Sequence, residues 1–127
     1  MIMLNDILLY IGSAILIVWG IAHIIPTKSV VNGFGQISQE NKRIITMEWV
    51  AEGLALCFIG MLVMLITIWD GSQNPISLHV YRICAVMLLV MAALTLATGA
   101  RTSIVAMKIC PFVKTTVAVL FLLGSML

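Results

Sequence analysis

The chain has 127 residues, of which 62% are hydrophobic and only 9% are charged, and its net charge at pH 7 is +2. About a quarter of the residues in a typical soluble domain are charged, so this composition cannot cover a water-facing surface. The small net charge, without a basic stretch interleaved with aromatic residues, excludes a typical nucleic-acid-binding protein. We therefore expect an all-α polytopic membrane protein, with one domain that forms a four-transmembrane-helix bundle in contact with the lipid bilayer.

The first predicted helix covers residues 4–25. A helix needs about 20 apolar residues to cross a hydrocarbon core of about 30 Å, and this segment is apolar apart from Asn5, Asp6 and His23. Pro26 should end the helix, because proline lacks the amide hydrogen and restricts the residue before it. The segment has neither a positively charged start nor a small-residue cleavage site after it, so we expect a retained helix and not a signal peptide.

The second predicted helix covers residues 44–69 and follows the longest polar stretch of the chain, residues 26–43. That stretch predicts a loop, with room for a short amphipathic helix on the membrane surface. The second helix is long enough to span with some tilt, and it carries Glu48 and Glu52 in its first third. The polar run 70–75 predicts a turn.

The third and fourth predicted helices cover residues 78–99 and 103–127. The fourth contains Pro111, which predicts a kink or a break in the helix. One interpretation is a helix kinked at this proline, and the other is a loop that ends just before it. Lys114 lies in the apolar part of this segment, and we expect its long side chain to extend toward the lipid headgroups.

The placement of lysine and arginine predicts the orientation, because these residues concentrate in short cytoplasmic connections. Of the seven basic residues, only Arg82 lies on the side of the chain termini. We therefore expect a multi-pass protein of the cell membrane with both termini on the outer side. The other six lie in or near the connections that follow the first and third helices: Lys28, Lys42, Arg43, Arg101, Lys108 and Lys114.

Ionisable side chains inside a bilayer are expensive, so each one invites a functional hypothesis. Glu52 is the strongest case, because it lies about 12 Å inside its predicted helix. Glu48 lies one turn earlier on the same helix face, and Trp49 lies beside it. Residues at the ends of the first and third helices should reach the same membrane face. The predicted ligand-binding cluster at the cytoplasmic mouth of the bundle therefore contains His23, Glu48, Trp49, Glu52 and Arg101.

Three interpretations of this cluster stay open. In the first, Glu48 or Glu52 pairs with Arg101, and the set only locks helix packing. In the second, the cluster binds a proton, a cation or a small amphipathic ligand such as a quinone. In the third, His23 and the two glutamates bind a metal ion, since one imidazole and two carboxylates are a plausible ligand set. The sequence names neither the metal nor any other cofactor.

Two segments resemble a family of small bacterial four-helix membrane proteins. Residues 20–26 read Gly-Ile-Ala-His-Ile-Ile-Pro, and residues 47–53 read Met-Glu-Trp-Val-Ala-Glu-Gly. Together with the four-helix pattern, they resemble the DoxX-like group, some of whose members are linked to quinone-coupled respiratory complexes. The resemblance implies a quinone or redox partner, and it carries over no functional residue.

The main functional hypothesis is an integral membrane protein that binds or moves a proton, a cation or a small amphipathic, quinone-like ligand. One alternative is a non-catalytic accessory subunit that forms a homo-oligomer or docks on a larger membrane complex through small-residue helix faces. The second alternative is a membrane enzyme acting on a lipid-like substrate. This one ranks last, because no nucleophile elbow, phosphate-binding loop or metalloprotease motif occurs and no catalytic residue can be named.

Overall fold

The computed structural model describes residues 3–127, and every regular element in that range is a helix. Four of these helices are long and apolar enough to cross a membrane. The prediction of an all-α, multi-pass helical bundle is therefore confirmed. The spanning helices are α1 (Leu4–Ile24), α3 (Gln39–Trp69), α4 (Pro75–Ala97) and α5 (Val105–Met126). The short elements are α2 (Thr27–Asn32) and the 3₁₀ turns η1 (Gly71–Gln73) and η2 (Gly99–Arg101).

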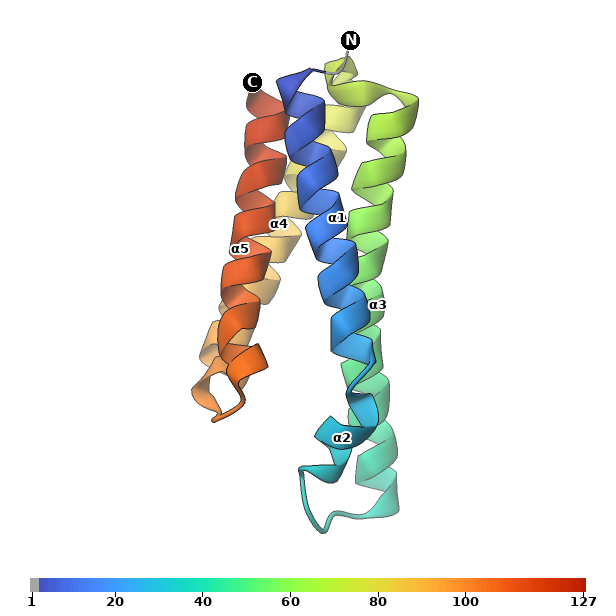
Figure 1. Cartoon of the computed structure of the whole chain (residues 1–127), viewed down its shortest axis with the longest axis vertical. Coiled ribbons are helices and arrows are strands. Elements are labelled where there is room, and N and C mark those ends of the chain that lie inside the picture. Colours follow the sequence, from blue (N-terminus) through green and yellow to red (C-terminus); the bar gives the residue numbers. More distant parts are fainter. Residues whose placement is uncertain (1–2) are drawn as a thin grey trace.

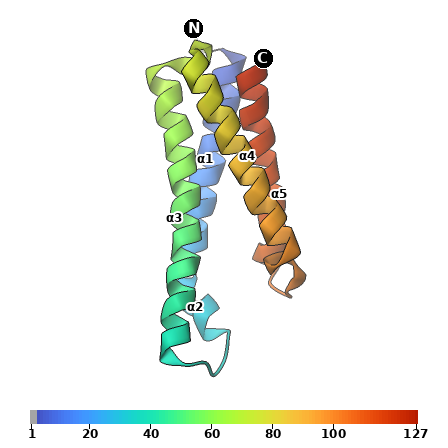
Figure 2. The same ribbon diagram turned by 180° about the vertical axis from the view of Figure 1, so that it is seen from behind.

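The four spanning helices form two pairs. Helix α1 packs against α3 and also against α5, while α4 packs against α5. Figures 1 and 2 show that the start of α1 and the end of α5 lie at the same end of the bundle, and that the pair α1–α3 diverges from the pair α4–α5 toward the opposite end. We call the end at which the helix pairs lie together the closed end. The end at which α1 and α4 finish and the pairs lie apart is the open end.

Small residues allow α1 and α3 to approach closely. A Cβ atom added to Gly20 would lie 2.8 Å from the carbonyl oxygen of Gly53 and 2.6 Å from the Cys57 sulfur. Further along the same contact, a Cβ atom on Gly60 would lie 3.0 Å from the carbonyl oxygen of Ser13. Lipid gives helices no hydrophobic reason to associate, so this close backbone approach supplies the packing between them.

Hydrogen bonds hold the closed end of the bundle together. The Asp6 carboxylate of α1 accepts a hydrogen bond from the backbone amide of Ser72, at 3.1 Å. The buried hydroxyl of Tyr81 on α4 lies 3.1 Å from the hydroxyl of Thr67 on α3 and donates to the carbonyl of Gly71 at 3.3 Å. These contacts join α1, α3 and α4 near the termini, so the helix pairs separate only at the other end.

Three helix starts differ from the predicted boundaries. Helix α4 begins at Pro75, three residues before the predicted start at residue 78, and the Asn74 side chain caps it. Helix α3 begins at Gln39, five residues before the predicted start at residue 44, because the Ser38 hydroxyl accepts a hydrogen bond from the amide of Asn41 and caps the helix. Helix α5 begins at Val105 and continues through Pro111. The polar residues 39–43, expected in a loop, therefore extend α3 by more than one turn.

Candidate functional site

A cluster of polar side chains lies where the two helix pairs diverge, and each spanning helix contributes one member. The Lys114 ammonium of α5 donates hydrogen bonds to the Glu52 carboxylate of α3 and, at 2.9 Å, to the hydroxyl of Thr95 on α4. The Nε2 atom of His23 on α1 lies 3.6 Å from the other carboxylate oxygen of Glu52. We call these four residues the polar cluster: His23, Glu52, Thr95 and Lys114.

Lys114 is completely buried, with 0% of its side chain exposed. The expectation that it extends to the headgroups is therefore wrong. A helical side chain slants toward the start of its own helix, so Lys114 reaches back toward the end where α5 begins and where α1 and α4 end. A buried charge needs a paired and hydrogen-bonded partner, and the carboxylate of Glu52, whose side chain is 32% exposed, supplies it.

Trp49 fixes the position of His23. The two rings stack with their centroids 4.1 Å apart and an angle of 14° between their planes. The indole of Trp49 also donates a hydrogen bond to the backbone carbonyl of His23, at 2.6 Å. That carbonyl belongs to the last turn of α1, where backbone acceptors lack partners within the helix. Both contacts hold the imidazole in one orientation beside Glu52.

The Nε2 atom of His23 is buried and has no hydrogen-bond partner. Its distance of 3.6 Å from Glu52 is longer than a normal hydrogen bond. A buried polar atom left without a partner costs about 1–3 kcal/mol. The imidazole therefore has an unused hydrogen-bonding capacity inside the protein.

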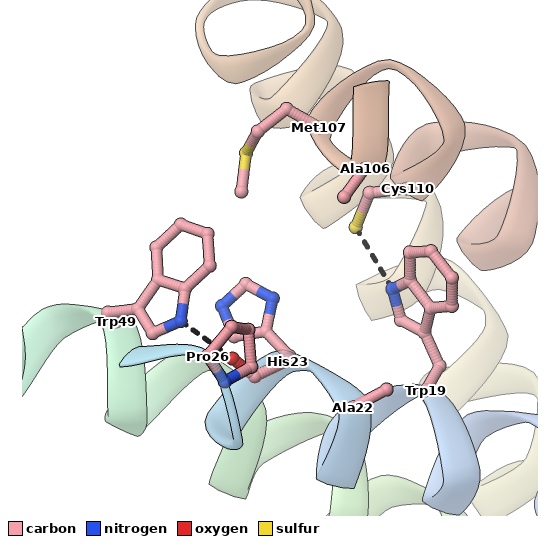
Figure 3. A pocket seen from close by; sticks show the side chains of 8 residues that line it. All are labelled: Trp19, Ala22, His23, Pro26, Trp49, Ala106, Met107 and Cys110. Carbon is pink, nitrogen blue, oxygen red and sulfur yellow. Dashed lines mark hydrogen bonds between the residues drawn. The ribbon is translucent and has the colours of Figure 1, made fainter. Parts of the chain in front are cut away.

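His23 also lines a cavity of about 150 Å³ between α1, α3 and α5, which we call the tryptophan cavity. Figure 3 shows its side chains converging from these three helices. The indole of Trp19 donates a hydrogen bond to the Cys110 sulfur at 3.3 Å and braces one wall. A cavity of about this volume holds one benzene-sized ring. Its lining residues are Trp19, Ala22, His23, Pro26, Trp49, Ala106, Met107 and Cys110.

A second cavity, of about 350 Å³, lies between α3 and α4, and we call it the α3–α4 cleft. Glu52 and Thr95 line it, while Met107 lines both this cleft and the tryptophan cavity. The polar cluster therefore lies between the two cavities: His23 lines the tryptophan cavity, and Glu52 and Thr95 line the α3–α4 cleft. The cleft is lined by Glu48, Ala51, Glu52, Met91, Leu94, Thr95, Thr98, Gly99 and Met107.

The structure brings together three of the five residues that the sequence analysis assigned to the site: His23, Trp49 and Glu52. Glu48 is exposed and lines only the α3–α4 cleft. Arg101 is exposed on η2 and forms no ion pair with either glutamate among residues 3–127. The first interpretation, in which Glu48 or Glu52 pairs with Arg101, is therefore wrong in its partner, because Lys114 pairs with Glu52.

Several residues of the site were missed, among them Trp19, Thr95, Met107, Cys110 and Lys114. One signal in the sequence could have identified Lys114. It lies more than two turns inside an apolar segment, and a charged side chain at such a depth needs a partner, as Glu52 does.

A metal site is not formed by the predicted residues. Within residues 3–127, no group of three or more histidine, cysteine, aspartate or glutamate side chains could hold a metal ion. The physical reason lies in the two glutamates, since Glu48 stands apart from the cluster and the Glu52 carboxylate is already bound by an ammonium group.

Comparisons with known proteins assign no family. No protein-family model, curated protein or solved structure matches the chain. The resemblance to the DoxX-like group stays a prediction.

Proposed function

We propose that this protein binds a small amphipathic molecule with one planar ring, of quinone-like chemistry, in the tryptophan cavity. The carrying observation is that His23, whose buried Nε2 atom has no hydrogen-bond partner, lines an otherwise apolar cavity. The ring would lie among Trp19, Trp49 and Met107, and its oxygen substituent would bond to the imidazole.

The physical chemistry of the cavity supports a ligand of this class. Ligand sites are mostly apolar and carry a small number of well-placed polar groups. Indole rings pack well against a planar ring in offset or edge-to-face geometry. A neutral imidazole has one donor and one acceptor nitrogen, so Nε2 can bond to a ring carbonyl or to a ring hydroxyl, according to its tautomer.

The charges of the polar cluster favour such a ligand over a metal ion or another free cation. The Glu52 carboxylate is the only acidic group in the cluster, and the Lys114 ammonium already neutralises it. A second cation would have to displace a buried lysine, which would then lack its partner. A neutral ring with a hydrogen-bonding oxygen adds no charge and leaves the pair of Glu52 and Lys114 in place.

We also propose that the site lies near the cytoplasmic face of the cell membrane, with both chain ends outside. Lys114 belongs to the polar cluster, so five basic residues remain in or near the two connections at the open end, against Arg82 at the closed end. This asymmetry still follows the positive-inside rule. We also propose that the protein forms a homo-oligomer or joins a larger membrane complex, which would cover the α3–α4 cleft.

The test is a titration of the purified protein in lipid nanodiscs with a short-tailed benzoquinone, followed by tryptophan fluorescence. We expect saturable quenching, and His23→Phe should weaken the affinity about tenfold, the equivalent of one hydrogen bond of about 1.4 kcal/mol. Phenylalanine keeps an aromatic ring that can stack on Trp49 and removes both hydrogen-bonding nitrogens. The matched control is His79→Phe, because His79 is exposed near the closed end of α4.

Equal affinities for the wild type and His23→Phe would contradict the proposal. Quenching that rises linearly with quinone in all three proteins would also contradict it, because it would show partition into lipid and no binding site.

A further inference from the structure

A third cavity, of about 480 Å³, lies beyond the end of α1, between that end, α2 and the start of α3. None of its lining residues belongs to the polar cluster or the tryptophan cavity. We call it the basic pocket, and it is lined by Ile25, Thr27, Lys28, Val31, Asn32, Gln39, Lys42 and Thr46.

The walls of this pocket are ordered helical segments. Just beyond the end of α1, the hydroxyl of Thr27 donates a hydrogen bond to the carbonyl of Ile24 and fixes the turn into α2. Helix α2 packs against α3, and its Val31 side chain is buried. The Ser38 cap fixes the first turn of α3 on the facing side. The pocket therefore has a defined shape in which Lys28 and Lys42 come from different helices.

The charge of the pocket is positive and unbalanced. Two of its lining residues are lysines and none is acidic. Among residues 3–127, neither Lys28 nor Lys42 has a carboxylate within ion-pair distance. Lysine ammonium groups bind phosphate as point charges, and the side-chain amides of Asn32 and Gln39 add hydrogen-bond donors. This set of groups suits a phosphate.

The depth of the pocket matches the lipid headgroups. Helix α1 has 21 residues, a length of about 32 Å, which is close to the hydrocarbon thickness of about 30 Å in a bilayer. The basic pocket begins at Ile25, directly after that helix, and therefore lies at the level of the headgroups. Ile25 is 76% exposed, so an apolar side chain lies at the rim of the pocket beside the two lysines. A phospholipid would place its acyl chain against Ile25 and its phosphate against the lysines.

We propose that the basic pocket binds the phosphate of an anionic phospholipid headgroup. The proposal is independent of the ring ligand, since the two sites share no residue. Anionic lipids attract basic groups at a membrane surface by about 1 kcal/mol per lysine. A free phosphate ion would satisfy the same ammonium groups but would make no use of the exposed Ile25, so we assign the lipid.

The test compares two double variants of the full chain in nanodiscs that contain phosphatidylglycerol and phosphatidylcholine. Retained lipid is counted by native mass spectrometry after release from the disc. Lys28→Gln with Lys42→Gln should lower the retained phosphatidylglycerol at least about tenfold, as expected for two lost lysine contacts. The matched control is Arg101→Gln with Lys108→Gln, which removes two exposed charges from the same end of the bundle, outside the pocket.

The proposal predicts a loss in the pocket variant and retention in the control. An equal loss in both variants would overturn it, because it would show unspecific surface attraction. Retention in both would overturn it as well. A last arm adds inorganic phosphate to the detergent-purified, lipid-free protein: saturable binding that Lys28→Gln removes, without selective retention of phosphatidylglycerol, would assign the pocket to free phosphate and reject the lipid.

Discussion

Lys114 of α5 donates a hydrogen bond to Glu52 of α3, and this ion pair joins the helix pair α4–α5 to the helix pair α1–α3. Its two members differ in exposure, since the lysine is completely buried while a third of the glutamate side chain is exposed in the α3–α4 cleft. Because of this difference, a substitution of Glu52 leaves a buried charge without a partner, whereas a substitution of Lys114 leaves a charge that is partly exposed.

Removing the carboxylate should destabilise the protein more than removing the ammonium group. Glu52→Gln leaves a buried ammonium without its partner, at a cost of about 3–5 kcal/mol. Lys114→Met fills the same space without charge and leaves a carboxylate that can reach water, so we expect a smaller loss, of about 1–2 kcal/mol. Unfolding followed by steric trapping in bicelles measures both free energies.

The double variant with both substitutions should be more stable than Glu52→Gln alone, because it contains no unpaired buried charge. Two single variants of equal stability would contradict the assignment of Lys114 as the buried partner.

The neighbouring glutamates should differ in their effect on ring binding. Glu52 lies 3.6 Å from His23, whereas Glu48 is exposed and makes no ion pair among residues 3–127. Glu48→Gln should leave the affinity for a short-tailed benzoquinone unchanged, while Glu52→Gln should lower it several-fold by releasing the polar cluster. The fluorescence titration separates them, and an equal effect of both would mean that only the overall charge of this helix face matters.

The contact between α1 and α3 should not tolerate a large side chain. Gly20→Leu would push its Cβ atom into Gly53 and Cys57, and overpacking of this kind costs about 1–3 kcal/mol or more. Ala14→Leu, on an exposed position of the same helix, is the control and should be nearly neutral. Thermal unfolding in detergent compares the two, and similar melting temperatures would refute the close packing.

The orientation can be tested with single cysteines in a cysteine-free background. Gln73→Cys at the closed end and Ser103→Cys at the open end both replace exposed residues. The positive-inside rule predicts that a membrane-impermeant maleimide labels position 73 in intact cells and position 103 only after permeabilisation. The reverse pattern would place the polar cluster near the outer face.

The fold could be predicted from the sequence because each spanning helix is a long apolar run, and such a run in lipid must satisfy its own backbone hydrogen bonds. The start of α3 was predicted five residues late, since the Ser38 cap extends the helix into polar residues that apolar length alone does not count. The polar residues show where the membrane-spanning part of α3 begins, whereas the Ser38 cap shows where the helix itself begins.

The site could be predicted only in part. His23 and Glu52 were identified correctly as neighbours, because both lie near the same end of adjacent helices. One of the three interpretations paired Glu48 or Glu52 with Arg101, on charge and depth alone. The choice between that arginine and Lys114 depends on the direction in which a long side chain slants and on which helices touch, and neither is visible in a single sequence.

The most direct test of the central claim is a nitrogen-15 NMR spectrum of histidine-labelled protein, because the chain contains only two histidines. Added short-tailed benzoquinone should shift the Nε2 resonance of His23 and leave that of the exposed His79 in place, with His23→Phe assigning the signal. An unchanged His23 resonance at saturating quinone, or equal shifts at both histidines, would contradict a ligand held by His23 in the tryptophan cavity.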